Sequence, residues 1–259
     1  MLNPNELVVF VHIMKTGGTT LRVNFLVQQY ESDVVGLNSP EEIIEKAMNE
    51  STKYISGHFG FGLYKAGSIN KMFIKSDFPR PLHYITLLRE PVDRIISLYY
   101  DIQRRFPDHP AVRNKDLKEF VETKNAFYEP NLQTLFITGG ILDFKLATER
   151  ITNDFKVVGI TELFNESVFL MKKELGWDKI TSLHQISERS MTYFHTTKLN
   201  NNPKRQKRDQ ISRDLIEFIE RSNSLDIQLY QFAKEYLIQR INSLDLKTKE
   251  EMDSFLGNS

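Results

Sequence analysis

The sequence predicts an α/β protein whose central, mostly parallel sheet is flanked by helices in three layers. Four apolar runs of strand length, at residues 7–13, 53–56, 83–88 and 155–160, alternate with segments of helical periodicity. Such alternation is typical of parallel sheets that are covered by helices on both faces. The chain has 259 residues, of which 40% are hydrophobic, so we expect residues 1–259 to form one domain.

Helix start signals follow the first and the third apolar run. Ser39-Pro40-Glu41-Glu42 combines a capping box with proline at the first helical position, and predicts a helix to about residue 49. Pro91 opens another helix. The apolar residues that follow it recur at helical spacing: Val92, Ile95, Ile96 and Tyr99.

Further helices are predicted in the middle of the chain. Asp116 with Glu119 repeats the capping-box pattern. A helix that begins near Pro130 is expected to end at Gly139-Gly140, because glycine commonly ends helices. Residues 163–175 have the pattern of another helix, which glycine again ends.

The C-terminal region is predicted to be mainly helical. The helical pattern runs from about residue 209 to residue 243, with a break at residues 222–224. Residues 245–259 are charged, and we expect them to fray. Residues 195–208 are irregular and contain five basic residues: Lys198, Lys204, Arg205, Lys207 and Arg208.

Composition excludes several classes of function. Lys plus Arg and Asp plus Glu are both 34, so no global positive field attracts nucleic acid. The chain has no cysteine, which excludes disulfides, zinc–thiolate sites and cysteine catalysis, and no other metal-ligand spacing occurs. No apolar run reaches about 18 residues and the first strand begins near residue 7, so we expect a soluble, cytoplasmic protein without membrane insertion. The sequence carries no signal for an oligomeric state.

The first candidate site follows the first apolar run. Lys15-Thr16-Gly17-Gly18-Thr19-Thr20 reads as a tight loop that opens a helix. The N–H groups at a helix start attract anions, glycines let the backbone approach a ligand, and lysine adds a full charge. The loop is therefore P-loop-like, but Lys15 precedes the glycines, whereas in a Walker P-loop the lysine follows them. Magnesium-dependent phosphoryl transfer is thus poorly supported.

The second and third candidate sites also follow predicted strands. Arg89 stands at the carboxyl end of a strand and Ser97 on the helix after it, so both can grip a second anion. The alternative is that Arg89 pairs with Glu90 or Asp93 on the surface. His58, in Ile55-Ser56-Gly57-His58-Phe59-Gly60, has the ordinary pKa range of a general base. The other five histidines are expected to be structural: His12, His83, His109, His184 and His195.

Together these segments resemble the sulfotransferases that use 3′-phosphoadenosine-5′-phosphosulfate (PAPS), over roughly residues 7–237. The segment 10–20 resembles the family's 5′-phosphosulfate loop, although Met14 replaces the usual proline. The segment 88–100 resembles the 3′-phosphate segment, with arginine and serine eight residues apart. Gly57-His58-Phe59 resembles the segment that carries the catalytic histidine in glycan O-sulfotransferases of the heparan 2-O and 6-O type. The run 157–162 also resembles that branch of the family.

The resemblance implies in-line transfer of a sulfuryl group from PAPS to an acceptor hydroxyl, with PAP as the product and no metal. It assigns the 5′-phosphosulfate to Lys15, Thr16, Gly17, Gly18, Thr19 and Thr20. It assigns the 3′-phosphate to Arg89 and Ser97, and the role of general base to His58.

A glycan is the favoured acceptor by resemblance, and a lipid, polyketide or small-molecule alcohol is the alternative. Five basic residues form either a local patch or a solvated helical face: Arg104, Arg105, Arg113, Lys115 and Lys118. Two other functions stay open on the residues alone: a magnesium-dependent small-molecule kinase, and a non-catalytic nucleotide-binding protein.

Overall fold

The computed structural model describes residues 6–31, 40–63, 78–183 and 206–257 of the chain. Its sheet has the strand order β2-β1-β3-β4, and all three neighbouring pairs are parallel, as predicted. The strands are β1 (Leu7–Val11), β2 (Tyr54–Gly57), β3 (Leu82–Leu88) and β4 (Phe155–Ile160).

The register of the sheet brings the ends of the strands together. Val11, the last residue of β1, pairs with Gly57 of β2 on one side and with Thr86 of β3 on the other. Every residue of β1 and β2 is buried, as expected for strands with helices on both faces. The three predicted sites, which follow β1, β2 and β3, therefore begin at one edge of the sheet.

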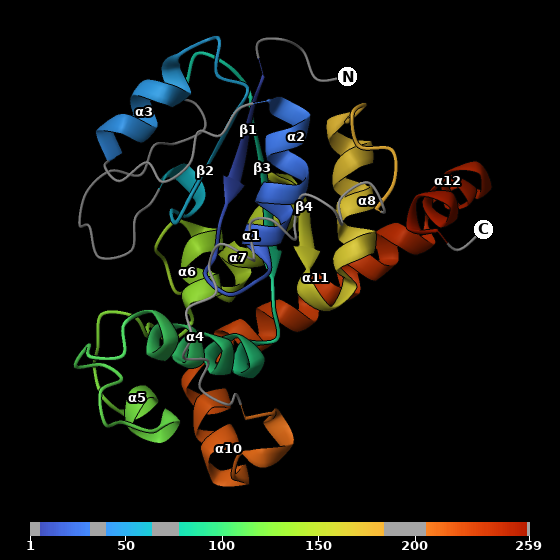
Figure 1. The fold of residues 1–259 in the computed structure, drawn as a ribbon. Helices are drawn as coiled ribbons and strands as arrows, with labels where there is room; N and C mark the ends of the chain where they lie inside the picture. The colour runs from blue at the N-terminus through green and yellow to red at the C-terminus, as the bar shows by residue number, and fades with distance from the viewer. Residues whose placement is uncertain (1–5, 32–39, 64–77, 184–205, 258–259) are drawn as a thin grey trace.

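One face of the sheet is covered by the helical segment after β1 and by the helix after β4 (Figure 1). The first consists of α1 (Gly18–Leu21), the π-helical turn η1 (Arg22–Leu26) and α2 (Val27–Tyr30), which follow one another without a break. After β4 come the short turn η4 (Thr161–Leu163) and α8 (Phe164–Leu175). The rings of Phe25 and Phe164 lie 6.1 Å apart and join the two parts.

Three helices cover the other face. They are α6 (Leu132–Thr138), α7 (Phe144–Asn153) and α11 (Ser224–Asn242), and α11 packs against α6, α7 and β4. The end of α6 at Gly139 agrees with the prediction. α7 was not predicted, although the side chain of Asp143 caps it by accepting a hydrogen bond from Leu146 N at 2.9 Å.

A second hydrophobic cluster lies below the carboxyl edge of the sheet in Figure 1. It joins α4 (Pro91–Arg105), α5 (Leu117–Glu122) and α10 (Arg213–Ser222), with the short turn η6 (Arg208–Gln210) beside α4. The predicted capping box of α5 is present. The apolar residues that predicted α4 are all buried: Val92, Ile95, Ile96 and Tyr99.

The remaining elements lie at the margins of the sheet. α3 (Pro40–Met48) packs beside β2, and η2 (Phe61–Leu63) follows β2. Ser39, where the predicted capping box begins, lies outside the described residues. The basic residues Lys198, Lys204 and Arg205 also lie outside them. Of that basic stretch the structure describes residues 206–208.

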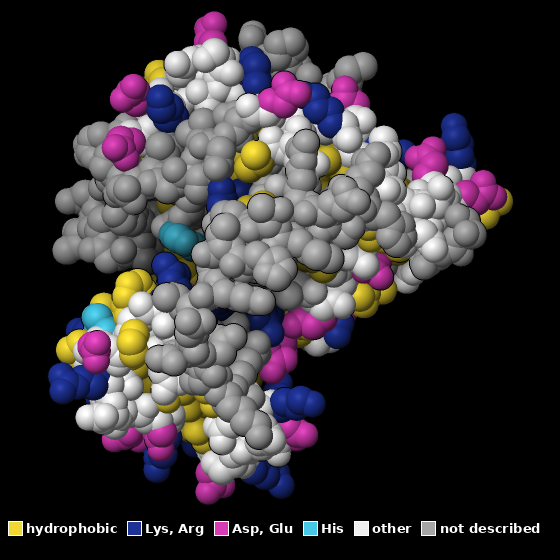
Figure 2. Space-filling model, in the orientation of Figure 1, with side chains coloured by type: hydrophobic (Ala, Val, Ile, Leu, Met, Phe, Trp, Pro, Cys, Tyr) yellow, Lys and Arg dark blue, Asp and Glu magenta, His cyan; other side chains and the backbone are white. Residues whose placement is uncertain are grey.

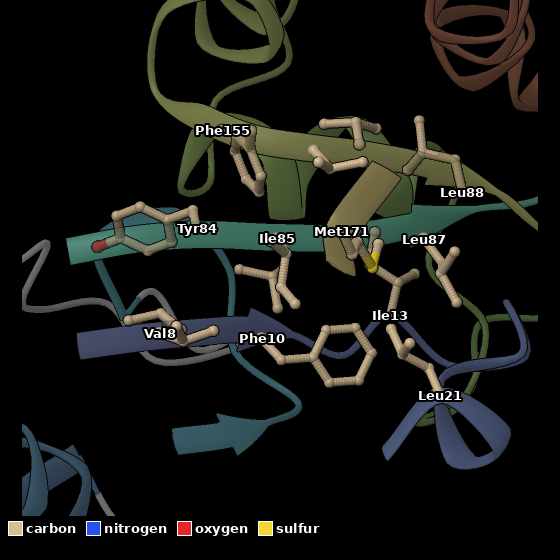
Figure 3. Packing of buried hydrophobic residues seen from close by; sticks show 14 of the residues in the cluster. Val8, Phe10, Ile13, Leu21, Tyr84, Ile85, Leu87, Leu88, Phe155 and Met171 are labelled. Carbon is tan, nitrogen blue, oxygen red and sulfur yellow. The ribbon is translucent and has the colours of Figure 1, made fainter. Parts of the chain in front are cut away.

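The main core lies between the sheet and its helices. Figure 3 shows side chains of β1, β3 and β4 packed with Leu21 of α1 and Met171 of α8, both fully buried. The C-terminal end differs from our expectation of fraying, because residues Leu246–Leu256 form the helix α12. Its Phe255 is only 3% exposed, and the ring lies 5.7 Å from that of Phe169 in α8. Burial of this aromatic side chain explains why the segment stays helical.

Candidate functional site

The loop between β1 and α1 has the backbone of a tight turn. Gly17 adopts a φ of 84° and Lys15 a φ of 69°, which is uncommon for a residue with a side chain. A β-carbon at Gly18 would lie 2.2 Å from Cδ2 of His12, so only glycine lets the helix start pack on this ring. The hydroxyl of Thr16 donates to the carbonyl of Ile13 at 2.9 Å and is buried, so Thr16 shapes the loop.

The helix that starts at Gly18 offers the free N–H groups of its first turn. These groups have no partners within a helix, and the peptide dipoles add positive charge there. The π-helical turn Arg22–Leu26 directly follows this first turn. π-Helical turns are rare and often lie at functional sites.

Lys15 is held by an acidic residue that the sequence analysis did not identify. The ammonium of Lys15 lies 3.3 Å from Oδ1 of Asp101 on α4. Arg104 and Arg105 approach the same carboxylate, at 2.8 Å and 3.5 Å. Burial lowers the pKa of Lys15, and the negative charge of Asp101 opposes this shift.

Asp101 stays ionised in this position. Burial alone would raise its pKa, but the hydrogen bond from Arg104 and the charge of Lys15 outweigh burial and hold the pKa below its usual value. Arg104 and Arg105, two of the basic residues noted in the sequence, thus lie beside the loop. Lys118 does not join them in this cluster, because it lies on α5, 3.9 Å from Glu122.

Arg89 lies at the second corner, between β3 and α4. Its guanidinium donates from Nη1 to the backbone carbonyl of Lys15 at 3.2 Å, so the two predicted anion sites are in direct contact. Glu90, one of the two alternative partners of Arg89, instead caps α4 by accepting from Asp93 N at 2.8 Å, and it also pairs with Arg208 at 3.0 Å. Ser97 is mostly buried on α4.

Thr161 also ties the two corners together. Its hydroxyl lies 2.7 Å from the carbonyl oxygen of Thr16 and 2.9 Å from that of Leu88. Thr161 directly follows β4, so its side chain joins the loop after β1 to the ends of β3 and β4. The sequence analysis included Thr161 only within the run 157–162 and gave it no role.

His58 follows β2 at the same edge. Its Nδ1 lies 2.8 Å from the carbonyl oxygen of His12, which can only accept a hydrogen bond, so Nδ1 carries the proton. In the neutral ring Nε2 is then the acceptor. The ring is open to solvent on one side, yet the surrounding protein removes part of its water and lowers its pKa. Arg105 and Arg22 lower it further.

His12 supports His58 without sharing its exposure. The two rings are 4.5 Å apart, and Phe10 stacks on His12 at 5.3 Å. Burial, with the neighbouring His58, lowers the pKa of His12 to about 3. His12 is therefore neutral near pH 7 and packed at the end of β1, as the sequence indicated.

Two further histidines are structural in the described parts of the chain. His83 lies 3.2 Å from Glu6, and the ring of His109 packs edge-on against Phe127 at 4.8 Å. His184 and His195 lie outside the described residues. Figure 2 shows a histidine with Lys or Arg side chains in the hollow between the sheet region and the α4–α5–α10 region. The geometry thus combines two corners that carry cationic side chains with a histidine whose Nε2 can accept a proton.

Residues 6–31, 40–63, 78–183 and 206–257 contain no group of three or more His, Cys, Asp or Glu side chains placed to hold a metal ion. No helix in these ranges combines the length and the apolar character that are needed to cross a membrane.

Comparison with known sequences gives consistent matches. Residues 1–233 match the model of the sulfotransferase family. Galactose-3-O-sulfotransferase 3 of Mus musculus is 25% identical over 195 residues, which cover 66% of this chain and 45% of that protein. Heparan-sulfate 6-O-sulfotransferase 1-B of Danio rerio is 25% identical over 291 aligned residues, which cover 98% of this chain and 71% of that protein. The chain thus spans under half the length of the galactose-3-O-sulfotransferase.

Two solved structures resemble the chain more distantly. One is a retinol dehydratase in complex with androsterone and inactive cofactor PAP, with 11% identity, a TM-score of 0.49 and coverage of 88% of this chain and 82% of that chain. The other is mouse sulfotransferase SULT7A1 complexed with PAP, with 16% identity, a TM-score of 0.43 and coverage of 100% and 86%.

Proposed function

This chain belongs to the sulfotransferase family, and from that premise we propose that it transfers a sulfuryl group from PAPS to an acceptor hydroxyl and releases PAP. In this reaction the acceptor oxygen attacks sulfur, and the bond from sulfur to the 5′-phosphate oxygen breaks. The acceptor proton goes to a base, and negative charge builds up on the leaving phosphate.

The contact between the two corners is the observation that carries the proposal. Arg89 donates to the carbonyl of Lys15 at 3.2 Å, and Thr161 bridges Thr16 and Leu88. Two cation-bearing corners at one sheet edge fit a ligand that has two separated anionic groups on one nucleoside. In this assignment the loop of residues 15–20 binds the 5′-phosphosulfate, while Arg89 and Ser97 bind the 3′-phosphate.

Lys15 and the helix start supply the electrostatic part of catalysis. The ammonium of Lys15 and the N–H groups at the start of α1 are directed toward the leaving 5′-phosphate in this assignment. Preorganised donors of this kind stabilise charge that develops in the transition state. We assign this role to the protein's own charges and need no metal for it.

His58 takes the acceptor proton in this mechanism. The carbonyl of His12 fixes the proton of His58 on Nδ1, so Nε2 has the lone pair that a base needs. The lowered pKa of His58 keeps this nitrogen free of a proton near pH 7. The open side of the ring provides access for the acceptor.

A glycan hydroxyl is the acceptor that we favour. The matched relatives are named for sulfation of galactose and of heparan sulfate. Arg105 and Arg22 stand near His58 and favour an acceptor that carries anionic groups nearby. A lipid, polyketide or small-molecule alcohol is the alternative that the experiment has to distinguish.

The test is to incubate the protein with ³⁵S-labelled PAPS and separate acceptor pools: galactose-terminated oligosaccharides, N-sulfated heparosan, lipid alcohols and phenols. We expect label in a glycan pool, and no label with the Lys15→Ala variant. Label in a lipid or phenol pool would retain sulfuryl transfer but overturn the glycan. Binding of PAP without transfer to any pool would indicate a non-catalytic protein, and magnesium-dependent consumption of ATP would indicate a kinase.

A further inference from the structure

The backbone of Arg89 is held by the side chain of Gln133 on α6, which covers the face of the sheet away from α1 and α8. Arg89 N donates to Oε1 of Gln133 at 2.9 Å, and Nε2 of Gln133 donates to Arg89 O at 2.9 Å. Gln133 belongs to α6 and is fully buried. One primary amide thus satisfies both backbone groups of the residue that joins β3 to α4, and fixes the peptide units on either side of it.

Gln133 is itself held in place by a buried carboxylate. Gln133 N donates to Oδ2 of Asp226 at 3.0 Å, and Thr134 N donates to Oδ1 at 2.7 Å. The hydroxyl of Thr134 donates to the same oxygen at 2.8 Å. Asp226 lies in the first turn of α11 and is fully buried, so it binds the N–H groups at the start of α6.

A buried cation completes this arrangement. Arg94, on α4, is 0% exposed, and its three guanidinium nitrogens make no hydrogen bond within the described parts of the chain. Asp226 is the main opposite charge that acts on it. Burial lowers the pKa of Arg94 and raises the pKa of Asp226, and the opposite charge of each opposes the shift of the other. Asp226 on α11 thus binds the start of α6 and also acts electrostatically on Arg94 of α4.

We infer that Gln133 is a positioning residue that sets the direction of the Arg89 guanidinium, and thereby the preference for nucleotides with a 3′-phosphate. This inference rests on the proposed function, because it takes the 3′-phosphate as the ligand of Arg89. Gln133 lies behind the backbone of Arg89 and holds it from the side of α6. Without the amide, Arg89 N and Arg89 O lose their hydrogen bonds with Gln133, and the backbone position from which the guanidinium extends is less constrained.

The experiment measures the affinity of PAP and of 5′-AMP, which lacks the 3′-phosphate, by calorimetry. The variants are Gln133→Met, which keeps the size but removes both hydrogen bonds, Arg89→Ala, and the double variant. We expect Gln133→Met to lower the affinity for PAP about tenfold, which is the scale of one to two lost hydrogen bonds. The affinity for 5′-AMP should change by less than about twofold. In the Arg89→Ala background, Gln133→Met should have no further effect on PAP, because residues that act through one another are not additive.

Several results would overturn the inference. An equal loss for PAP and 5′-AMP would show a general structural role, and additive losses in the double variant would show that Gln133 does not act through Arg89. If Gln133→Met does not fold, Gln133→Glu replaces it. The carboxylate still accepts a hydrogen bond from Arg89 N but has no proton to donate to Arg89 O. The preference for PAP over 5′-AMP should therefore fall in this variant too. Retention of the preference in Gln133→Glu would contradict the inference.

Two controls separate this inference from the proposed function. Gln228→Met on α11 removes an exposed amide that donates to Ser224 O, and should leave both affinities unchanged. A wild-type protein that does not prefer PAP over 5′-AMP would contradict the proposed function itself. A wild-type preference that persists in Gln133→Met would contradict only the role of Gln133.

Discussion

His58→Ala is the substitution that tests the proposed chemistry most directly. We expect the turnover number for the labelled acceptor to fall by about 10²–10⁴-fold, which is the usual contribution of a general base and corresponds to about 2.7–5.4 kcal/mol of barrier. The structure supports the full effect, because Nδ1 of His58 is committed to the carbonyl of His12 at 2.8 Å and leaves Nε2 as the acceptor.

The same substitution should change donor binding very little. The His58 ring lies against His12, on which Gly18 packs, so it touches the loop through this neighbour. The loss of one hydrogen bond to a backbone carbonyl is on the order of 0.5–1.5 kcal/mol, and it affects mainly the position of His12. We therefore expect the affinity of PAP in calorimetry to stay within about tenfold of the wild type.

The pH dependence gives a second measurement of the same role. Partial removal of water, with Arg105 and Arg22 nearby, lowers the pKa of His58 below 6.5. The base form then predominates above pH 6.5, and the acid limb of kcat/KM for PAPS should be centred below that value. kcat/KM is the right quantity, because it reports the groups of the free enzyme.

The matched control is His109→Ala, which removes a histidine that packs on Phe127 and has no role in the proposed site. It should retain both turnover and the acid limb of the profile. Wild-type turnover in His58→Ala would exclude His58 as the base. An acid limb centred above pH 6.5 would show that the assigned environment of the ring is wrong.

Three further predictions concern the anion corners and the core. Lys15→Ala should lower turnover more than PAP affinity, because its contact strengthens as charge develops; equal losses in kinetics and calorimetry would indicate simple binding. Arg89→Ala should weaken the binding of PAP by about 1.5–3 kcal/mol, or about 10- to 150-fold, and should leave the affinity for 5′-AMP unchanged; wild-type PAP affinity would place the 3′-phosphate elsewhere. Phe255→Ala should lower the free energy of unfolding in urea by about 3–5 kcal/mol, because the ring is buried in the core. Leu246→Ala, at an exposed position of the same helix, should change it by less than about 0.5 kcal/mol, and similar losses in both would contradict the docking of α12.

The elements that were predictable carry their signals locally. The four strands are apolar runs, and α4 and α5 have their start residues in the adjacent sequence. Parallel pairing then places the ends of β1, β2 and β3 at one edge, so the meeting of Lys15, Arg89 and His58 in one region also followed from the fold class. Their individual roles stay predictions that the experiments above test.

Asp101 and Gln133 were not predictable in the same way. Gln133 is 44 residues from Arg89 and reaches it from a helix on the far face of the sheet. Asp101 meets Lys15 because of the direction in which α4 leaves the sheet, and no local pattern encodes that direction. α7 and α12 show a different limit. The cap at Asp143 was present in the sequence, but a charged helix such as α12 becomes stable only because Phe255 finds a core to enter.

The pairing of Val11 with Thr86 has a consequence for how such proteins diversify. The two loops that we assign to the donor follow neighbouring strands, and neighbouring strands lie about 4.8 Å apart in every sheet. Substitution of side chains does not change this strand spacing. Loops outside the sheet can therefore change in length or charge and accept new acceptors of the transferred group. The distance between the two strands that carry the loops assigned to the nucleotide stays constant.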